Sequence, residues 1–137
     1  MHIINTFLFG QDGEYSQAAI FDLIKSHFSG DESAEFSEEE QPFGLSPKLR
    51  IEFSDYWILI SVIQDESIKE SINNIQEITK QELETTLSPQ CEVRTFFAPD
   101  ENSEFDHIAI DMYQFLEGLP NSLVYDDNHE KIISKCI

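Results

Sequence analysis

The residues best suited to metal chemistry lie toward the C-terminus of the chain. His107 and Asp111 are four positions apart in a stretch that we expect to be helical, so they would share one face. A second group, DDNHE at 126–130, places carboxylates around His129. Neither group has the spacing of a zinc motif, or the glycine and register of a calcium-binding loop. We interpret them as a polar helix face and a polar turn, and we predict no metal and no cofactor.

The chain carries no motif for nucleophilic catalysis or nucleotide binding. It lacks the G-x-S-x-G, P-loop, G-x-G-x-x-G and C-x-x-C patterns. Cys91 and Cys136 are too few for a disulfide framework, and we interpret them as packing or near-terminal residues. With 27 acidic residues, chance pairs of carboxylates are expected, so such a pair does not indicate acid–base catalysis. We predict that the protein is not an enzyme.

Acidic residues occur in blocks that contain no lysine or arginine, with aromatic residues among or beside them. The blocks are DESAEFSEEE at 31–40, DENSEFDHIAID at 100–111 and DDNHE at 126–130. Such charge steers a cationic partner toward the surface, and aromatic rings supply the buried contact. We therefore predict a partner-binding surface made of Asp31, Glu32, Glu35, Phe36, Glu38, Glu39, Glu40, Asp100, Glu101, Glu104, Tyr125, Asp126 and Asp127.

The overall charge points the same way. Acidic residues outnumber lysine and arginine by 27 to 8, and the formal net charge of −19 far exceeds the ~2–8 charges that solubility asks of a small domain. This field repels nucleic acids and anionic membranes, so we predict that the chain binds neither. The first residues do not resemble a secretory signal, and the longest apolar run, YWILISVI at 56–63, is too short to span a bilayer. We expect a cytoplasmic protein with reduced thiols.

The apolar pattern predicts an α+β fold. We expect strands over 2–10, 48–53, 56–64, 91–99 and 122–126, and helices over 15–29, 67–87 and 103–118. Ser67 and Glu70 have the spacing of a capping box at the start of the second helix. The order β-α-β-β-α-β-α(-β) predicts an antiparallel sheet with helices packed on one face, either ferredoxin-like or a different α+β sheet. Residues 1–137 should form a single domain that contains a long acidic loop at 31–47.

In size, acidity and element order, the whole chain resembles the small immunity proteins of bacterial toxin–immunity systems, including contact-dependent growth inhibition. The segments that carry the resemblance are the acidic block 31–40, FFAPDENSEFDHIAIDMYQFL at 96–116, and Tyr125-Asp126-Asp127. The resemblance implies that the chain binds and neutralises a cognate basic toxin domain, typically a nuclease, in a one-to-one complex. It implies no particular site residue, because no diagnostic motif carries it.

Two other functions remain open from the sequence. A nucleic-acid mimic would inhibit several DNA-binding proteins, although the acids here cluster in expected loops and do not follow the helices at regular spacing. A small metal-dependent enzyme would use His107 with Asp111, or Asp127 with His129 and Glu130. Binding of one basic protein, of many nucleic-acid-binding proteins, or of a divalent metal ion would distinguish the three.

Overall fold

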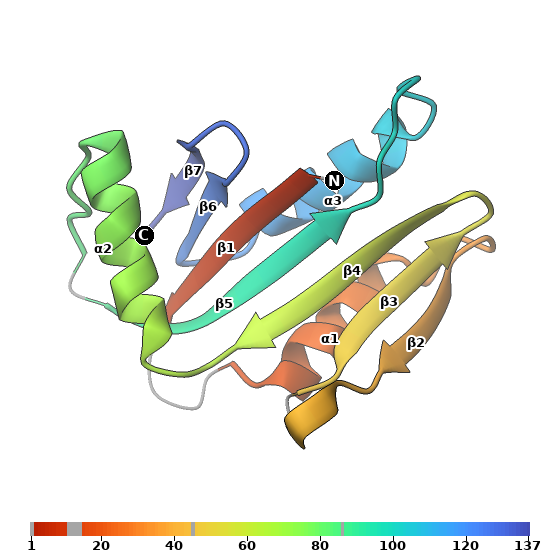
Figure 1. Ribbon diagram of the computed structural model, residues 1–137, viewed down its shortest axis with the longest axis horizontal. Coiled ribbons are helices and arrows are strands. Elements are labelled where there is room, and N and C mark those ends of the chain that lie inside the picture. Colours follow the sequence, from red (N-terminus) through yellow and green to blue (C-terminus); the bar gives the residue numbers. More distant parts are fainter. Residues whose placement is uncertain (1, 11–14, 45, 86) are drawn as a thin grey trace.

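A computed structural model of the chain describes residues 2–10, 15–44, 46–85 and 87–137 (Figure 1). It contains seven strands, three α-helices and one short 3-10 helix among these residues. In chain order they are β1 (His2–Gly10), α1 (Gln17–His27), β2 (Glu35–Glu39), η1 (Pro42–Gly44), β3 (Lys48–Phe53), β4 (Tyr56–Ile63), α2 (Ser67–Thr79), β5 (Ser88–Phe97), α3 (Asp106–Glu117), β6 (Ser122–Asp126) and β7 (Lys131–Cys136).

All strands join one sheet, in the order β2-β3-β4-β5-β1-β6-β7. Every neighbouring pair in this sheet is antiparallel. The first strand of the chain therefore lies in the interior of the sheet, between β5 and β6, and the acidic strand β2 forms one edge. This arrangement confirms the predicted α+β fold with an antiparallel sheet.

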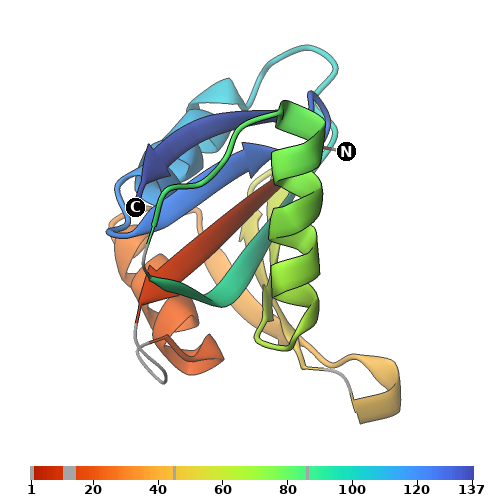
Figure 2. The same ribbon diagram turned by 90° about the vertical axis from the view of Figure 1, so that its left-hand side faces the viewer.

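The helices cover both faces of the sheet, as Figure 2 shows edge-on. α1 and α3 pack on one face, where Ile24 and Met112 are completely buried in the larger core. α2 packs on the other face, where Ile72 and Ile75 join a second core with Phe7. The expectation that the helices share one face holds for α1 and α3 and is wrong for α2. The chain consequently lacks the one-sided helix layer of the ferredoxin-like arrangement.

The segment 31–47, expected to be a long acidic loop, contains regular structure. Residues Glu35–Glu39 form β2, which pairs with β3 along its whole length, from Glu35 opposite Glu52 to Glu39 opposite Lys48. Backbone pairing stabilises this strand although its sequence, EFSEE, has little β-propensity. The expectation of a loop is therefore wrong for these five residues.

α2 starts where the sequence predicts, but its cap and its end differ from the prediction. Asp65 Oδ1 accepts hydrogen bonds from the backbone N–H of Ser67, at 2.9 Å, and from the Ser67 hydroxyl. The N-cap position is Glu66, which makes no side-chain cap hydrogen bond, so the predicted capping box of Ser67 and Glu70 does not form. The helix ends at Thr79, and the C-cap residue Lys80 has left-handed backbone angles. The helix is therefore shorter than the predicted 67–87. Leu83 still packs on the second core from a non-helical segment.

Candidate functional site

The strand register brings several acidic segments to one end of the sheet. Along this end lie the start of β2, the β3–β4 turn, the end of β5, the start of β1 and the β6–β7 turn. Phe53 pairs with Tyr56, Ile58 with Phe97, and Phe97 with His2. In Figure 1 these strand ends and turns all lie along the upper and right-hand margin of the sheet. Segments that are far apart in the sequence therefore meet on one surface.

We name this surface the acidic end. The acidic side chains that it presents, all exposed except the half-buried Asp100, are Asp31, Glu32, Glu35, Glu52, Asp55, Asp100, Glu101, Glu104, Asp106, Asp127 and Glu130. Lys131 is the only lysine or arginine in the segments 31–35, 52–57, 97–106 and 126–131. The predicted binding residues of the blocks 100–111 and 126–130 thus lie at the same end of the sheet as the first part of the block at 31–40.

A hollow of about 330 Å³ opens at the acidic end. Its walls come from β1, β4, β5 and α3 and combine carboxylates with aromatic rings: His2, Tyr56, Phe97, Ala98, Pro99, Asp100, Asp106, Ala109 and Tyr113. Burial raises the pKa of Tyr56 to about 12, and the nearby charges of Asp100 and Asp106 act in the same direction. The pKa of Tyr113 is also raised to about 12, by burial and then by Asp126 and Asp106. Both phenols therefore stay neutral beside these carboxylates at physiological pH.

Three of the predicted binding residues have structural roles in this surface. Asp31 accepts a 2.9 Å hydrogen bond from the backbone N–H of Ser33, and the Ser33 hydroxyl bond is the main cause of its lowered pKa. Asp100 accepts hydrogen bonds from the backbone N–H groups of Glu104, at 2.9 Å, and Phe105, at 2.8 Å. Asp126 is only 6% exposed. These carboxylates hold the loops, and the exposed neighbours remain available to a partner.

Glu38, Glu39 and Glu40 belong to a different surface. They lie toward the other end of β2 from Glu35, since Glu39 pairs with Lys48 at the start of β3. Arg50 lies between the two surfaces: its Nη1 is 3.2 Å from the Glu39 carboxylate, and its Nε is 2.6 Å from the carboxylate of Glu52 at the acidic end. The structure therefore divides the predicted acidic block 31–40 between the acidic end and the edge hairpin.

The aromatic residues predicted as anchors are turned inward. Tyr125 is 3% exposed in the second core, and Phe36 packs against the first. Phe43 is 98% exposed at the tip of the turn between β2 and β3, which protrudes from the body in Figure 2. Two tyrosine rings line a hollow beside carboxylates instead: Tyr113 is half-buried, and Tyr56 is itself buried, with 5% of its surface exposed. Tyr113 is one of the aromatic residues that accompany the acidic block at 100–111, whereas nothing in the sequence indicates Tyr56, because the strand and the helix that carry the two rings meet only in the fold.

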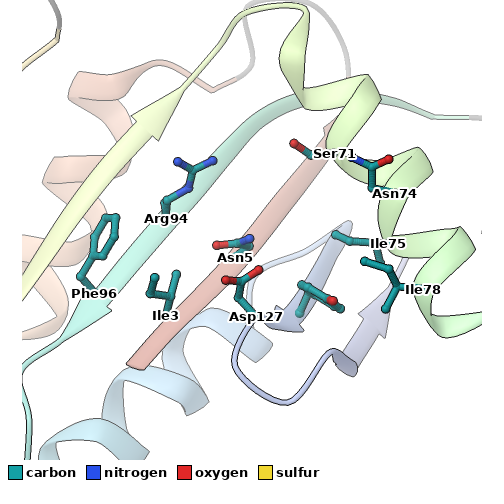
Figure 3. A pocket seen from close by; sticks show the side chains of 10 residues that line it. Ile3, Asn5, Ser71, Asn74, Ile75, Ile78, Arg94, Phe96 and Asp127 are labelled. Atoms are coloured by element: carbon teal, nitrogen blue, oxygen red, sulfur yellow. The ribbon is translucent and has the colours of Figure 1, made fainter. Parts of the chain in front are cut away.

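A second recess lies between α2 and the sheet and has a volume of about 400 Å³ (Figure 3). Arg94 and Asn5 border it from β5 and β1, and Ser71 and Asn74 from α2. The guanidinium of Arg94 is paired with the buried Glu92, with Nη2 and the carboxylate oxygen 2.6 Å apart. Asn5 Oδ1 is buried without a hydrogen-bond partner among the described residues, so a donor placed in this recess would satisfy it.

His107 and Asp111, which we interpreted as part of a polar helix face, are not brought into a metal-binding group among the described residues. Asp111 contacts His27 instead, with Nε2 and Oδ1 3.1 Å apart, which ties α1 to α3. In the turn after β6, His129 contacts Asp126 at 2.8 Å, and His2 approaches the same carboxylate from β1. The part of the chain that the structure describes thus holds one group with the composition of a metal site, and its member His2 lies far from the other two in the sequence, so no motif indicates it.

Comparisons with known proteins give no match: neither a family model, nor a curated protein, nor a solved structure is similar to this chain. Within the described ranges, no helix combines the length and apolarity that crossing a membrane requires.

Proposed function

We propose that this chain is a binding protein that neutralises a basic protein partner through its acidic end, in the manner of the small immunity proteins that it resembles. The partner would be a cationic toxin domain, a nuclease being the expected kind, in a one-to-one complex. The chain would act by binding and not by catalysis.

The observation that carries this proposal is the hollow at the acidic end. Carboxylates of Asp100 and Asp106 stand beside the rings of Tyr56 and Tyr113. A lysine or arginine side chain gains from the carboxylates, which pair with its charge, and from the half-buried ring of Tyr113, because aromatic rings attract cations. The hollow is therefore suited to receive one basic side chain of a partner while the surrounding acids meet others.

The loops that present the acids are held in place before any partner arrives. Hydrogen bonds from backbone N–H groups to Asp31 and Asp100 fix the turns that carry Glu32, Glu101 and Glu104. A surface that is ordered in advance loses less conformational entropy on binding. The concentration of like charge also steers a basic partner during diffusion and makes association sensitive to salt.

A nuclease binds the phosphate backbone of its nucleic-acid substrate with lysine and arginine side chains. The acidic end can cover those side chains and so exclude the nucleic acid. The listed acids of the acidic end have no regular spacing along a helix: they come from turns, from strand ends and, for Asp106, from the first residue of α3. This arrangement favours one shaped partner over imitation of a duplex.

The test is affinity capture from the source cell with matched baits. The first bait is the native chain. The second carries Glu101→Lys, Glu104→Lys and Asp127→Lys at the acidic end. The third carries Glu70→Lys, Glu77→Lys and Glu84→Lys on α2 and the segment after it, where all the replaced residues are also exposed.

Both variants change the net charge equally, so they separate position from total charge. We expect one basic protein, in stoichiometric amount and resistant to moderate salt, on the native and third baits but not on the second. When purified, this protein should lose its activity at a one-to-one ratio with the native chain. Equal recovery on all baits, or many proteins released at low salt, would contradict the proposal.

A further inference from the structure

A group of two histidines and one carboxylate lies at the junction of β1, β6 and the β6–β7 turn. His2 stands at the start of β1, Asp126 ends β6, and His129 follows in the turn. One side-chain ligand atom from each residue lies within 4.8 Å of those from the other two. The rings of His2 and His129 are 5.8 Å apart between centroids.

The turn that carries this group is fixed to β1 by its backbone. The N–H of Asp127 donates to the carbonyl of Ile3 at 3.2 Å, and the N–H of Ile3 donates to Asn128 Oδ1 at 2.8 Å. Within the turn, Asp126 Oδ1 accepts the backbone N–H groups of Asn128 and His129, at 3.0 and 3.1 Å. The carboxylate is thus oriented by the backbone, in the way that hydrogen bonds from neighbouring groups orient the ligands of metal sites.

The imidazole of His2 supplies an independent observation. Its Nε2 is buried from solvent and has no hydrogen-bond partner among the described residues. This nitrogen lies 3.5 Å from Asp126 Oδ1, close to the carboxylate but without a hydrogen bond to it. A buried polar atom without a partner is costly, and in a folded protein it calls for a specific explanation such as an ion. A cation between His2 and Asp126 would satisfy it.

We propose that His2, Asp126 and His129 bind a divalent transition-metal ion, with Zn²⁺ as the best match. Two imidazole nitrogens and one carboxylate oxygen are a ligand set that zinc accepts, whereas Ca²⁺ and Mg²⁺ prefer oxygen ligands alone. Tetrahedral zinc with bonds of ~2.0–2.2 Å places its ligand atoms about 3.3 Å apart. The three atoms therefore need to close by about 1.5 Å at most from their separations of up to 4.8 Å.

The surroundings suit a cation that keeps an open coordination position. Asp127 and Glu130 flank the group and add negative charge. His129 is 66% exposed, so an ion can enter from solvent. His2 also borders the hollow at the acidic end, which leaves room for a water or another fourth ligand. Structural zinc sites have four protein ligands, whereas a site with three protein ligands keeps its fourth position open for a water or another ligand.

The experiment is calorimetric titration of the full chain with ZnCl₂, compared with His2→Gln and His129→Gln variants. Glutamine keeps a polar side chain, and circular dichroism checks that each variant folds. The matched controls are His107→Gln and His27→Gln, since both histidines lie outside the group. A Co²⁺ titration followed by visible absorption provides a second readout, because tetrahedral ligation gives a strong band.

We expect one Zn²⁺ per chain, with affinity at least tenfold weaker in each of the His2 and His129 variants and unchanged in both controls. Removal of a group that only hydrogen-bonds to a metal ligand typically lowers metal affinity 10–100-fold, so removal of a ligand itself should lower the affinity at least as much. Zinc binding that is equally strong in all variants would overturn the proposal, because it would assign binding to surface carboxylates. Absence of any one-to-one binding to the native chain would overturn it as well. Neither result depends on the protein partner proposed above.

Discussion

Arg94 should be essential to stability because it is the partner of a buried carboxylate. Glu92 is 1% exposed, and one of its oxygens accepts a hydrogen bond from Arg94 Nε at 2.9 Å and forms an ion pair with Nη2 at 2.6 Å. Hydrogen bonds to charged groups contribute roughly 1.5–3 kcal/mol each, and breaking a buried ion pair by removing one partner costs roughly 3–5 kcal/mol. We therefore expect Arg94→Ala to lower the free energy of unfolding by about 4 kcal/mol at pH 7.5.

Glu92→Gln should be much milder. It removes the buried charge, and the Arg94 side chain that remains is 38% exposed and can be hydrated. We expect a loss of about 1 kcal/mol or less for this variant. In the double variant, the amide replaces the unpaired carboxylate, so most of the loss caused by Arg94→Ala should be recovered. Urea denaturation of the native chain and the three variants measures all of these values.

The pH dependence of the Arg94→Ala variant gives a second check. Burial raises the pKa of Glu92 despite the opposing influence of Arg94, so removal of Arg94 should raise this pKa further. When the folded pKa is above the unfolded one, the folded state keeps its proton longer, and the free energy of unfolding falls as pH rises between the two values. Arg94→Ala should therefore be less harmful at pH 4.5 than at pH 7.5. A loss below about 1 kcal/mol that does not change over this range would refute the reasoning.

Three further predictions concern single positions. Asp126→Ala should lower the free energy of unfolding by about 3 kcal/mol, because it removes hydrogen bonds from two backbone N–H groups and one imidazole. Replacing the exposed neighbour, Asp127→Ala, should change the free energy of unfolding by less than about 0.5 kcal/mol. Similar losses for both variants in thermal denaturation would contradict this difference. A thiol reagent should label the exposed Cys136 in the native chain, and it should label Cys91 only after unfolding, because Cys91 is buried and burial raises its pKa to about 12. Rapid labelling of both cysteines in the native chain would be inconsistent with the core described above. Phe43→Asn should raise the free energy of unfolding by about 1 kcal/mol, because Phe43 has a φ of 60° and its ring is 98% exposed, so a measured loss would show that the ring makes contacts.

The elements with a clear apolar period could be predicted from the sequence. YWILISVI alternates between buried and half-buried positions along β4, and the antiparallel α+β class follows from such segments. β2 was missed because EFSEE has one apolar residue and depends on pairing with β3. The end of α2 was placed too late because Leu83 and Leu87 continue the helical spacing, yet both pack on the second core from a segment outside the helix.

The order of strands and helices does not indicate that α2 packs on the second face of the sheet, but the sequence of β1 does. Phe7, Leu8 and Phe9 are consecutive and all buried, so β1 must be covered on both faces. The candidate site was harder to predict. The acidic blocks identified most of the exposed carboxylates of the acidic end, but the block at 31–40 is divided between two surfaces. Tyr56, Tyr113 and His2 reach the site only through strand register and helix packing, which the sequence alone does not determine.

The association rate constant of the captured basic partner tests the central proposal most directly. It should be measured by stopped-flow fluorescence with the native chain, the acidic-end variant and the charge-matched α2 variant, at low and moderate salt. Electrostatic steering raises association from roughly 10⁵–10⁶ to as much as 10⁸–10⁹ M⁻¹s⁻¹, so reversal at the acidic end should slow association at low salt by at least about tenfold. The α2 variant should stay within about threefold of the native chain. Equal slowing in both variants, or none in the acidic-end variant, would contradict the proposal that the acidic end is the binding surface.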